Sequence, residues 1–250
     1  MRGLNSKRVV ITGGASGIGA AAAARFLQEG ARVCIIDRDA RANAKIAALL
    51  PDLSGTLECD VSVLEQVQEA LSQAEERMGG VNVLINNAGI SIRHRFLDIT
   101  PAEWHQVMAV NLTGNFYIAQ TAARHMMGGG GGVILNTAST NGIMGYPFYA
   151  DYNASKAGVI ELTRSMALEL APTIRVNAVA PGYVLTPMQR AEYTDEMLEE
   201  VNRKIPLGRH AQPEEVAALF AFLASDEAAY ITGHVFTIDG GEIAGGLASR

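Results

Sequence analysis

The chain has 250 residues, of which 48% are hydrophobic and 18% are charged, and its formal net charge is −6. This acidic balance disfavours a nucleic-acid-binding surface, because such a surface needs clustered Lys and Arg side chains to neutralise phosphates. No segment is apolar and long enough to cross a membrane, and no signal-like apolar stretch precedes the first expected strand, so we expect a cytoplasmic protein without a membrane partner.

Short runs rich in Val and Ile alternate with longer stretches of helical period, which is typical of βαβ units around a parallel sheet. Continuous apolar runs such as VVIT and VCIID indicate strands that are buried on both sheet faces. We therefore expect one α/β domain over residues 1–250: a Rossmann-like, doubly wound parallel β-sheet of about seven strands with helices on both faces. The expected strands are residues 8–12, 32–37, 56–60, 81–86, 133–137, 174–179 and 235–238, and the expected helices are residues 17–29, 39–50, 63–78, 101–127, 152–170 and 213–224.

A glycine-rich turn, Thr12 to Gly19 (TGGASGIG), connects the first expected strand to the first helix. Glycines let the chain turn sharply and let its backbone approach a pyrophosphate, while the helix N-terminus offers free N–H groups to the anion. A glycine turn that binds nothing would have the same spacing, so the motif alone does not decide between the two interpretations.

Asp37 ends the second expected strand, about twenty residues beyond the glycines, where a carboxylate can accept hydrogen bonds from ribose hydroxyls. The same carboxylate would repel the 2′-phosphate of NADP, and Ser16 offers that phosphate no cation. Arg38 follows Asp37 and could weaken the repulsion. We therefore predict NAD as the cofactor and leave some use of NADP open.

A catalytic metal is not expected, because the chain has no His-x-x-x-His pair and no Cys-x-x-Cys pair to bind zinc. Its two cysteines, Cys34 and Cys59, lie in apolar runs. We expect them to be buried, reduced thiols.

The segment YNASK places Tyr152 and Lys156 four residues apart at the start of an expected helix, so that they share one face. A lysine ammonium beside a phenol favours the phenolate and lowers its pKa toward working pH, which makes Tyr152 a candidate acid/base. Ser139, just after the strand VILNT, could bind a substrate oxygen or serve only in a turn. Asn111 lies inside the expected helix 101–127, where an asparagine is mildly unfavourable unless it faces solvent or caps a turn.

With these motifs in this order, the sequence resembles the short-chain dehydrogenase/reductase family, in its common single-domain form, over essentially its whole length. The resemblance implies that Tyr152 transfers the substrate proton and that Ser139 orients the carbonyl or alkoxide. Lys156 would tune Tyr152 and hold the nicotinamide ribose, and Asn111 would position water in a proton relay. The matching signatures are TGGASGIG from Thr12, Asp37, Asp60-Val61, Asn86-Asn87-Ala88-Gly89, Asn111, Ser139, Tyr152 with Lys156, and Pro181-Gly182 with Thr186.

The resemblance also implies sites for cofactor, substrate and partner subunits. Assembly into a homotetramer is expected from the resemblance, whereas the candidate substrate lid at residues 183–206 is inferred from the composition of that segment, which is polar, contains Met and is bounded by prolines. The implied NAD-binding residues are Gly13, Ser16, Gly17, Ile18, Gly19, Asp37, Arg38, Asp60, Val61, Asn87, Ala88, Gly89, Tyr152, Lys156, Pro181, Gly182, Val184 and Thr186. The implied substrate-binding residues are Ser139, Asn141, Tyr146, Tyr152, Tyr183, Met188 and His94, in a pocket that Ile90, Ile92, Ile143 and Met144 would make mostly apolar.

These features favour an NAD-dependent dehydrogenase of a free secondary alcohol or ketone: a polyol, a sugar, or an alicyclic or steroid-like alcohol. A 3-oxoacyl thioester reductase of the same family is the main alternative. Such enzymes typically dock an acidic carrier through basic residues, whereas this chain has glycines at 128–132 and Ala-Pro-Thr at 171–173. A non-catalytic dinucleotide-binding regulator is a second alternative, but such proteins usually lose a catalytic residue, and all four are present here.

Overall fold

The strands form a single parallel sheet, seen in a computed structural model that describes residues 1–245. Within this range the sheet has seven strands in the order β3-β2-β1-β4-β5-β6-β7, which confirms the predicted fold class. The strands are β1 (Arg8–Thr12), β2 (Arg32–Asp37), β3 (Gly55–Glu58), β4 (Val83–Asn86), β5 (Gly132–Thr137), β6 (Ile174–Pro181) and β7 (Val235–Ile238).

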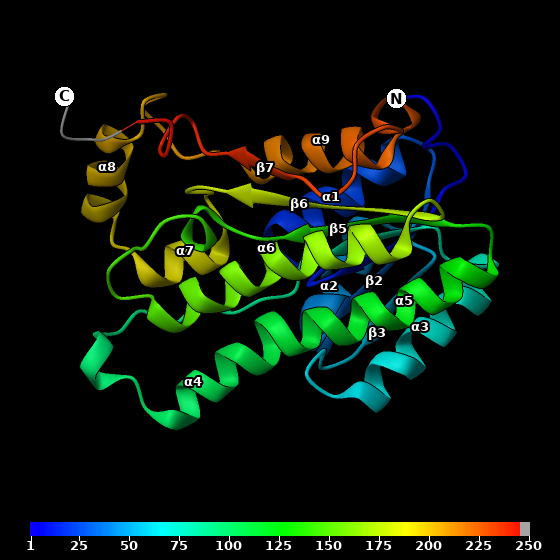
Figure 1. Cartoon of the computed structure of the whole chain (residues 1–250), viewed down its shortest axis with the longest axis horizontal. Helices are drawn as coiled ribbons and strands as arrows, with labels where there is room; N and C mark the ends of the chain where they lie inside the picture. Colours follow the sequence, from blue (N-terminus) through cyan, green and yellow to red (C-terminus); the bar gives the residue numbers. More distant parts are fainter. Residues whose placement is uncertain (246–250) are drawn as a thin grey trace.

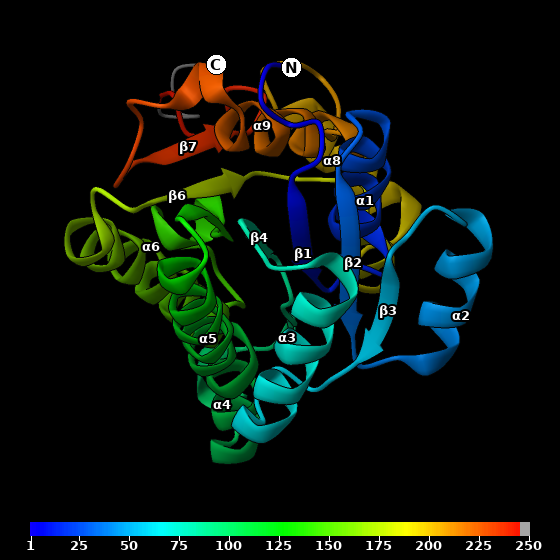
Figure 2. The same cartoon turned by 90° about the vertical axis from the view of Figure 1, so that its right-hand side faces the viewer.

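Helices cover both faces of this sheet (Figures 1 and 2). One face packs against α1 (Gly17–Gln28), α2 (Ala40–Leu49) and α9 (Pro213–Ala224), and the other against α3 (Leu64–Met78), α5 (Asn115–Gly128) and α6 (Ala150–Leu170). Successive strand residues point to opposite faces. In β1, for example, Val9 and Ile11 belong to the core beneath α1 and α9, whereas Val10 belongs to the core beneath α3 and α5. Both cores are therefore built from the same continuous apolar strands.

The long helix expected over residues 101–127 is interrupted. It consists of α4 (Pro101–Met108), a π-helical segment η2 (Ala109–Gly114) and α5. The π turn contains Asn111, whose side chain bonds the backbone of Ile90 instead of facing solvent. Such turns often occur at functional sites because they redirect one side chain out of the regular helical pattern.

Residues 183–206, for which no secondary structure was expected, contain two short helices, α7 (Pro187–Glu192) and α8 (Asp195–Lys204). Each begins after a threonine whose hydroxyl accepts a backbone N–H: Thr186 from Gln189 and Thr194 from Met197. These threonines are N-caps, a signal that was readable from the sequence. In Figure 1 the two helices lie beyond the ends toward which the arrows of β6 and β7 point.

The short 3₁₀ helices are η1 (Phe96–Asp98), η3 (Thr140–Gly142) and η4 (Asp226–Ala228). No helix within residues 1–245 combines the length and the apolar character needed to cross a bilayer. Cys34 and Cys59 are buried and form no disulfide, and burial raises the pKa of each thiol to about 11.

The strand order reverses between β1 and β4, which are neighbours in the sheet but not in sequence. Loops that leave the carboxyl ends of two such strands run in opposite directions and open a crevice between them. The glycine turn follows β1, and the Asn87-Ala88-Gly89 segment follows β4. The predicted dinucleotide motif therefore lies at the switch point of the sheet.

Candidate active site

The glycine turn leaves the N-terminus of α1 open. Gly13 and Gly17 have φ angles of +61° and +52°, in the left-handed region that favours glycine. A side chain on Gly19 would collide with the carbonyl oxygen of Gly13, so α1 can start close to the turn only with glycine there. Ser16 precedes α1 without a capping hydrogen bond from its side chain, and the first turn contains no acidic residue. The N–H groups of this turn are thus available to an anion, as a pyrophosphate would require.

The Asp37 carboxylate is held beside this turn. One of its oxygens accepts the N–H of Ala15 at 3.2 Å and the other accepts the N–H of Asp39 at 3.1 Å. Arg38 acts on a second carboxylate, Asp60. The Ser62 hydroxyl is the main cause that lowers the pKa of Asp60, and the Arg38 guanidinium lowers it further. The glycine turn therefore has a carboxylate beside it that can accept hydrogen bonds from the hydroxyl groups of a ligand.

A cavity of about 260 Å³ extends from Asp37 and Asp60 to Tyr152 and Lys156. Its lining combines glycines, carboxylates and apolar side chains, the residue types that hold the pyrophosphate, riboses and adenine of a dinucleotide. Of the residues predicted to bind the cofactor, it is lined by Gly13, Ser16, Gly17, Ile18, Asp37, Arg38, Asp60, Val61, Asn87, Ala88, Gly89, Tyr152, Lys156 and Thr186. Residues that line it without having been predicted to bind the cofactor are Ile36, Cys59, Ile90, Val110, Thr137, Pro187 and Met188.

Four residues predicted to bind the cofactor do not line this cavity. Gly19 packs beneath the glycine turn. Pro181 ends β6 and is buried, and Val184 is buried and pairs with Ala211 in a β-bridge. Gly182 faces the neighbouring, smaller cavity instead.

Lys156 is buried beside Tyr152 but is bonded elsewhere. Its Nζ donates to the carbonyl oxygen of Thr137 at 2.7 Å and lies 5.6 Å from the centroid of the Tyr152 ring. Burial lowers the pKa of Lys156 to about 8. Burial raises the pKa of Tyr152 to about 12, the Ser139 hydroxyl acts in the opposite direction, and the Glu192 carboxylate raises it further. The Lys156 ammonium is directed to Thr137, so the expectation that Lys156 brings the pKa of Tyr152 toward working pH stays a prediction.

Ser139 lies just beyond β5, where it precedes η3. Its hydroxyl accepts the N–H of Asn141 at 3.2 Å and donates to Oδ1 of Asn141 at 3.3 Å, and it lies close enough to the Tyr152 phenol to lower the pKa of that phenol. Ser139 is thus the N-cap of the 3₁₀ helix η3 and also a neighbour of the Tyr152 phenol. From this one position it can both serve in the turn and bind a substrate oxygen.

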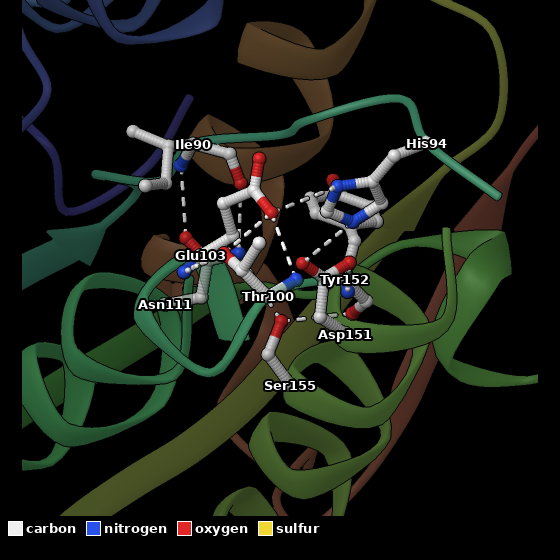
Figure 3. Close-up of polar contacts among 8 residues, drawn as sticks. All are labelled: Ile90, His94, Thr100, Glu103, Asn111, Asp151, Tyr152 and Ser155. Carbon is white, nitrogen blue, oxygen red and sulfur yellow. Dashed lines mark hydrogen bonds and ion pairs between the residues drawn. The ribbon is translucent and has the colours of Figure 1, made fainter. Parts of the chain in front are cut away.

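Asn111 is almost fully buried and links three segments (Figure 3). Its Oδ1 accepts the Ile90 N–H at 2.8 Å, and its Nδ2 donates to the Ile90 carbonyl oxygen at 2.9 Å and to Ser155 Oγ at 3.1 Å. Ser155 Oγ in turn donates to the Tyr152 carbonyl oxygen at 2.8 Å. These bonds connect the segment after β4 to the helix that carries Tyr152, so the solvent-facing alternative for Asn111 is excluded.

His94 does not reach the substrate side. Its Nε2 lies 3.1 Å from Oδ2 of Asp151, a fully buried carboxylate whose Oδ1 accepts the N–H of Tyr152 at 2.7 Å (Figure 3). His94 lines neither cavity, so the structure does not bring it together with the other predicted substrate-binding residues. The long-range contact with Asp151, which local spacing could not reveal, ties the loop before η1 to the start of α6.

A second cavity, of about 80 Å³, adjoins Ser139 and Tyr152. Two carboxylates and several tyrosines face it, and the apolar residues Ile90, Ile92, Ile143 and Met144 do not line it, so its wall is aromatic as expected but more polar. The predicted substrate residues that line it are Ser139, Asn141, Tyr146, Tyr152, Tyr183 and Met188, and the residues that sequence reasoning missed are Ser91, Thr140, Tyr149, Gly182, Gln189, Glu192, Tyr193 and Glu242.

Glu242 was missed because it belongs to no motif. It follows the Asp239-Gly240-Gly241 turn after β7. The usable signal was the place of this turn: residues that follow the carboxyl end of a parallel strand lie at the ligand-binding edge of the sheet. Within residues 1–245, no group of three or more His, Cys, Asp or Glu side chains is arranged to hold a metal ion.

Known proteins match the chain along nearly its whole length. A family model described as Enoyl-(Acyl carrier protein) reductase matches residues 13–242. The 3-oxoacyl-[acyl-carrier-protein] reductase of Thermotoga maritima is 41% identical over 242 residues, which are 95% of this chain and 98% of that protein. The NAD-dependent glycerol dehydrogenase of Listeria innocua is 35% identical over 239 residues, covering 95% and 94%. A solved short-chain type dehydrogenase/reductase from Mycobacterium marinum superposes with a TM-score of 0.92 at 37% identity and covers 97% of both chains.

Proposed function

The chain belongs to the short-chain dehydrogenase/reductase family and is an oxidoreductase, and from this premise we propose that it is an NAD-dependent dehydrogenase of a free secondary alcohol. The observation that carries the proposal is the position of Tyr152, which lines both the cavity beside the glycine turn and the smaller one next to it. A phenol between a cofactor and a substrate can exchange a proton with the substrate oxygen. NAD, when bound, supplies the hydride acceptor, and the protein supplies positioning and proton transfer.

The preference for NAD over NADP rests on Asp37. Its carboxylate is fixed beside the glycine turn by two backbone N–H groups and is placed to accept the hydroxyls of the adenosine ribose. A phosphate on that ribose would lie against this charge. Arg38, the nearest cation in sequence, acts on Asp60, which reduces its value as a phosphate partner. The NAD-dependent relative from Listeria innocua also supports this assignment.

In the proposed reaction, Tyr152 takes the hydroxyl proton of the alcohol, and returns it in the reverse direction. Ser139 holds the same oxygen, and its hydroxyl lowers the pKa of Tyr152 and so favours the phenolate form. Lys156 is assigned to the nicotinamide ribose, with Thr137 as its present partner. Asn111 positions Ile90 through two backbone hydrogen bonds, and a water relay at Asn111 stays a prediction, as do the cytoplasmic location and the homotetramer.

Reduction of a 3-oxoacyl thioester is the second candidate, because the relative from Thermotoga maritima is named for this reaction. One experiment separates the candidates. NADH formation is measured across polyols, sugars, alicyclic alcohols, hydroxysteroids and hydroxyacyl thioesters, with NAD and NADP in parallel. We expect the strongest NAD-linked rate with a free alcohol. The largest kcat/KM with a thioester and NADP would instead assign the chain to the reductases.

The segment 183–206 is proposed to close over bound substrate. Its base is fixed where Leu185 N–H donates to the Ala211 carbonyl oxygen at 2.9 Å, and Tyr149, which immediately precedes α6, donates to Glu192 at 2.9 Å. Most other residues of α7 and α8 are exposed, so these helices are expected to open locally. Hydrogen exchange of residues 187–204 should slow when NADH and a substrate analogue bind, while exchange in α9 should not change. Equal protection of α7 and α8 with and without ligands would refute the lid.

A further inference from the structure

We propose that Glu192 and Glu242 select the substrate: they accept hydrogen bonds from hydroxyl or ammonium groups next to the reacting carbon, and they exclude alcohols that carry a carboxylate. This inference rests on the proposed function, because it names the substrate class of the same site. Both glutamates line the smaller cavity together with Tyr152 and Ser139. They therefore face whatever part of the substrate lies beyond the reacting oxygen.

Glu242 is held in this wall by its own turn. Asp239 accepts the N–H groups of Gly241 and Ile243, each at 2.9 Å, which fixes the backbone on both sides of Glu242. One Glu242 oxygen accepts the Tyr146 hydroxyl at 2.6 Å, and the other has only a long contact, 3.5 Å, with the Thr140 hydroxyl. Burial raises the pKa of Glu242. The second oxygen therefore lacks a good donor, and a substrate donor would favour the charged carboxylate.

Glu192 ends α7 on the lid side of the same cavity. Its Oε2 accepts the Tyr149 hydroxyl at 2.9 Å, whereas its Oε1 is buried without a hydrogen-bond partner among the described residues. Gln189, one turn earlier on α7, likewise has a buried Nε2 without a partner in this part of the chain. Buried polar atoms without partners are rare because they cost free energy. A polyhydroxylated ligand could satisfy both, with a hydroxyl that donates to Glu192 and a hydroxyl oxygen that accepts from Gln189.

The charges around the cavity determine what it rejects. Its lining, given above for the described residues, includes two glutamates but no Lys, Arg or His. Tyr146 and Tyr149 direct their hydroxyls to the glutamates, so they are not free to donate to an anion. A substrate carboxylate would lie near two like charges, and the lining offers it neutral donors such as Gln189 but no cation to offset the repulsion. A long acyl chain would bury the glutamates against apolar groups, which is also unfavourable.

The test uses four alcohols that share a CH₃–CHOH– unit and differ only in the group attached to it. The attached group is CH₂OH in propane-1,2-diol, CH₂NH₃⁺ in 1-aminopropan-2-ol, CH₂CH₃ in butan-2-ol and COO⁻ in lactate. We expect the diol or the amino alcohol to exceed butan-2-ol by about tenfold or more in kcat/KM, as one hydrogen bond to a charged group implies. The kcat/KM for lactate is expected to be lower than that for butan-2-ol. If kcat/KM is larger for the diol, the group that the glutamates recognise is a hydroxyl; if it is larger for the amino alcohol, the group is an ammonium.

The variants Glu192→Gln and Glu242→Gln should lower the ratio of kcat/KM for the diol to that for butan-2-ol. They should also raise kcat/KM for lactate relative to the values for the diol and for butan-2-ol. Glu76→Gln is the matched control, because Glu76 is an exposed acidic residue of α3 that lines neither cavity, and its ratios should equal those of the wild type. Melting temperature and NADH affinity check that each variant is folded. Ratios that do not change in either active-site variant, or butan-2-ol as the best of the four substrates, would overturn the inference while leaving the dehydrogenase intact.

Failure of the proposed function gives a different result. If the wild type oxidises no alcohol of the wider panel, the dehydrogenase assignment fails, and calorimetric binding of propane-1,2-diol, 1-aminopropan-2-ol and lactate to the NADH complex then decides the inference by itself. Binding of the diol or amino alcohol that weakens in Glu192→Gln or Glu242→Gln supports it. Binding of lactate that is equal to or tighter than that of both donor-bearing ligands overturns it.

Discussion

Replacement of Tyr152 by Phe should lower kcat for alcohol oxidation by about 10²–10⁴-fold, the usual contribution of a general acid/base, while NADH affinity stays nearly unchanged. The reason is that only the phenolic hydroxyl is lost. The ring keeps its edge contact with Tyr149, at 6.4 Å between centroids, and its place between the two cavities. Steady-state rates and NADH fluorescence titration measure the two quantities separately.

The matched control is Tyr230→Phe, because Tyr230 is fully exposed, and it should not change either quantity. The pH dependence gives a second check. Burial raises the pKa of Tyr152 to about 12, so the form that accepts the alcohol proton becomes more abundant as the pH rises, and wild-type oxidation should accelerate above neutrality. Retention of most activity in Tyr152→Phe, with the same pH profile, would show that another group transfers the proton.

The parts of the site that were predictable depend on local spacing. The glycine turn, Asp37 and the Tyr152/Lys156 pair each follow from a few residues whose geometry is set by a strand end or by one helical turn. The alternation of apolar strands with amphipathic helices was likewise enough to predict the sheet and its two helix layers, because both patterns are local.

Residues whose positions depend on long-range contacts were not predictable in the same way. His94 is 57 positions from Asp151, the residue that takes it away from the cavity, and Glu242 meets Tyr146 across 96 positions. Asn111 was recognised as unusual, but its partner Ile90 follows another strand, so the π turn was not predictable from the helix alone. The polar character of the substrate cavity arises from these distant pairings.

Replacement of Asp37 by Ala should shift the ratio of kcat/KM for NAD to that for NADP by about tenfold to a hundredfold toward NADP. Two effects add: loss of an acceptor for the ribose hydroxyls, for which hydrogen bonds to charged groups contribute about 1.5–3 kcal/mol, and loss of repulsion against a 2′-phosphate. Asp52→Ala is the matched control, because Asp52 is exposed and lies outside the cavity. Its ratio should equal that of the wild type.

The same carboxylate also supports the glycine turn through Ala15 and Asp39, so Asp37→Ala alone cannot separate selectivity from support. Asp37→Asn removes the charge but keeps an oxygen that can accept one of these two N–H groups. If Asp37 selects the cofactor by charge, both variants move toward NADP. If it only holds the turn, Asp37→Ala weakens NAD and NADP equally and Asp37→Asn largely restores both, so an unchanged ratio in the two variants would refute its assignment as the selector of NAD.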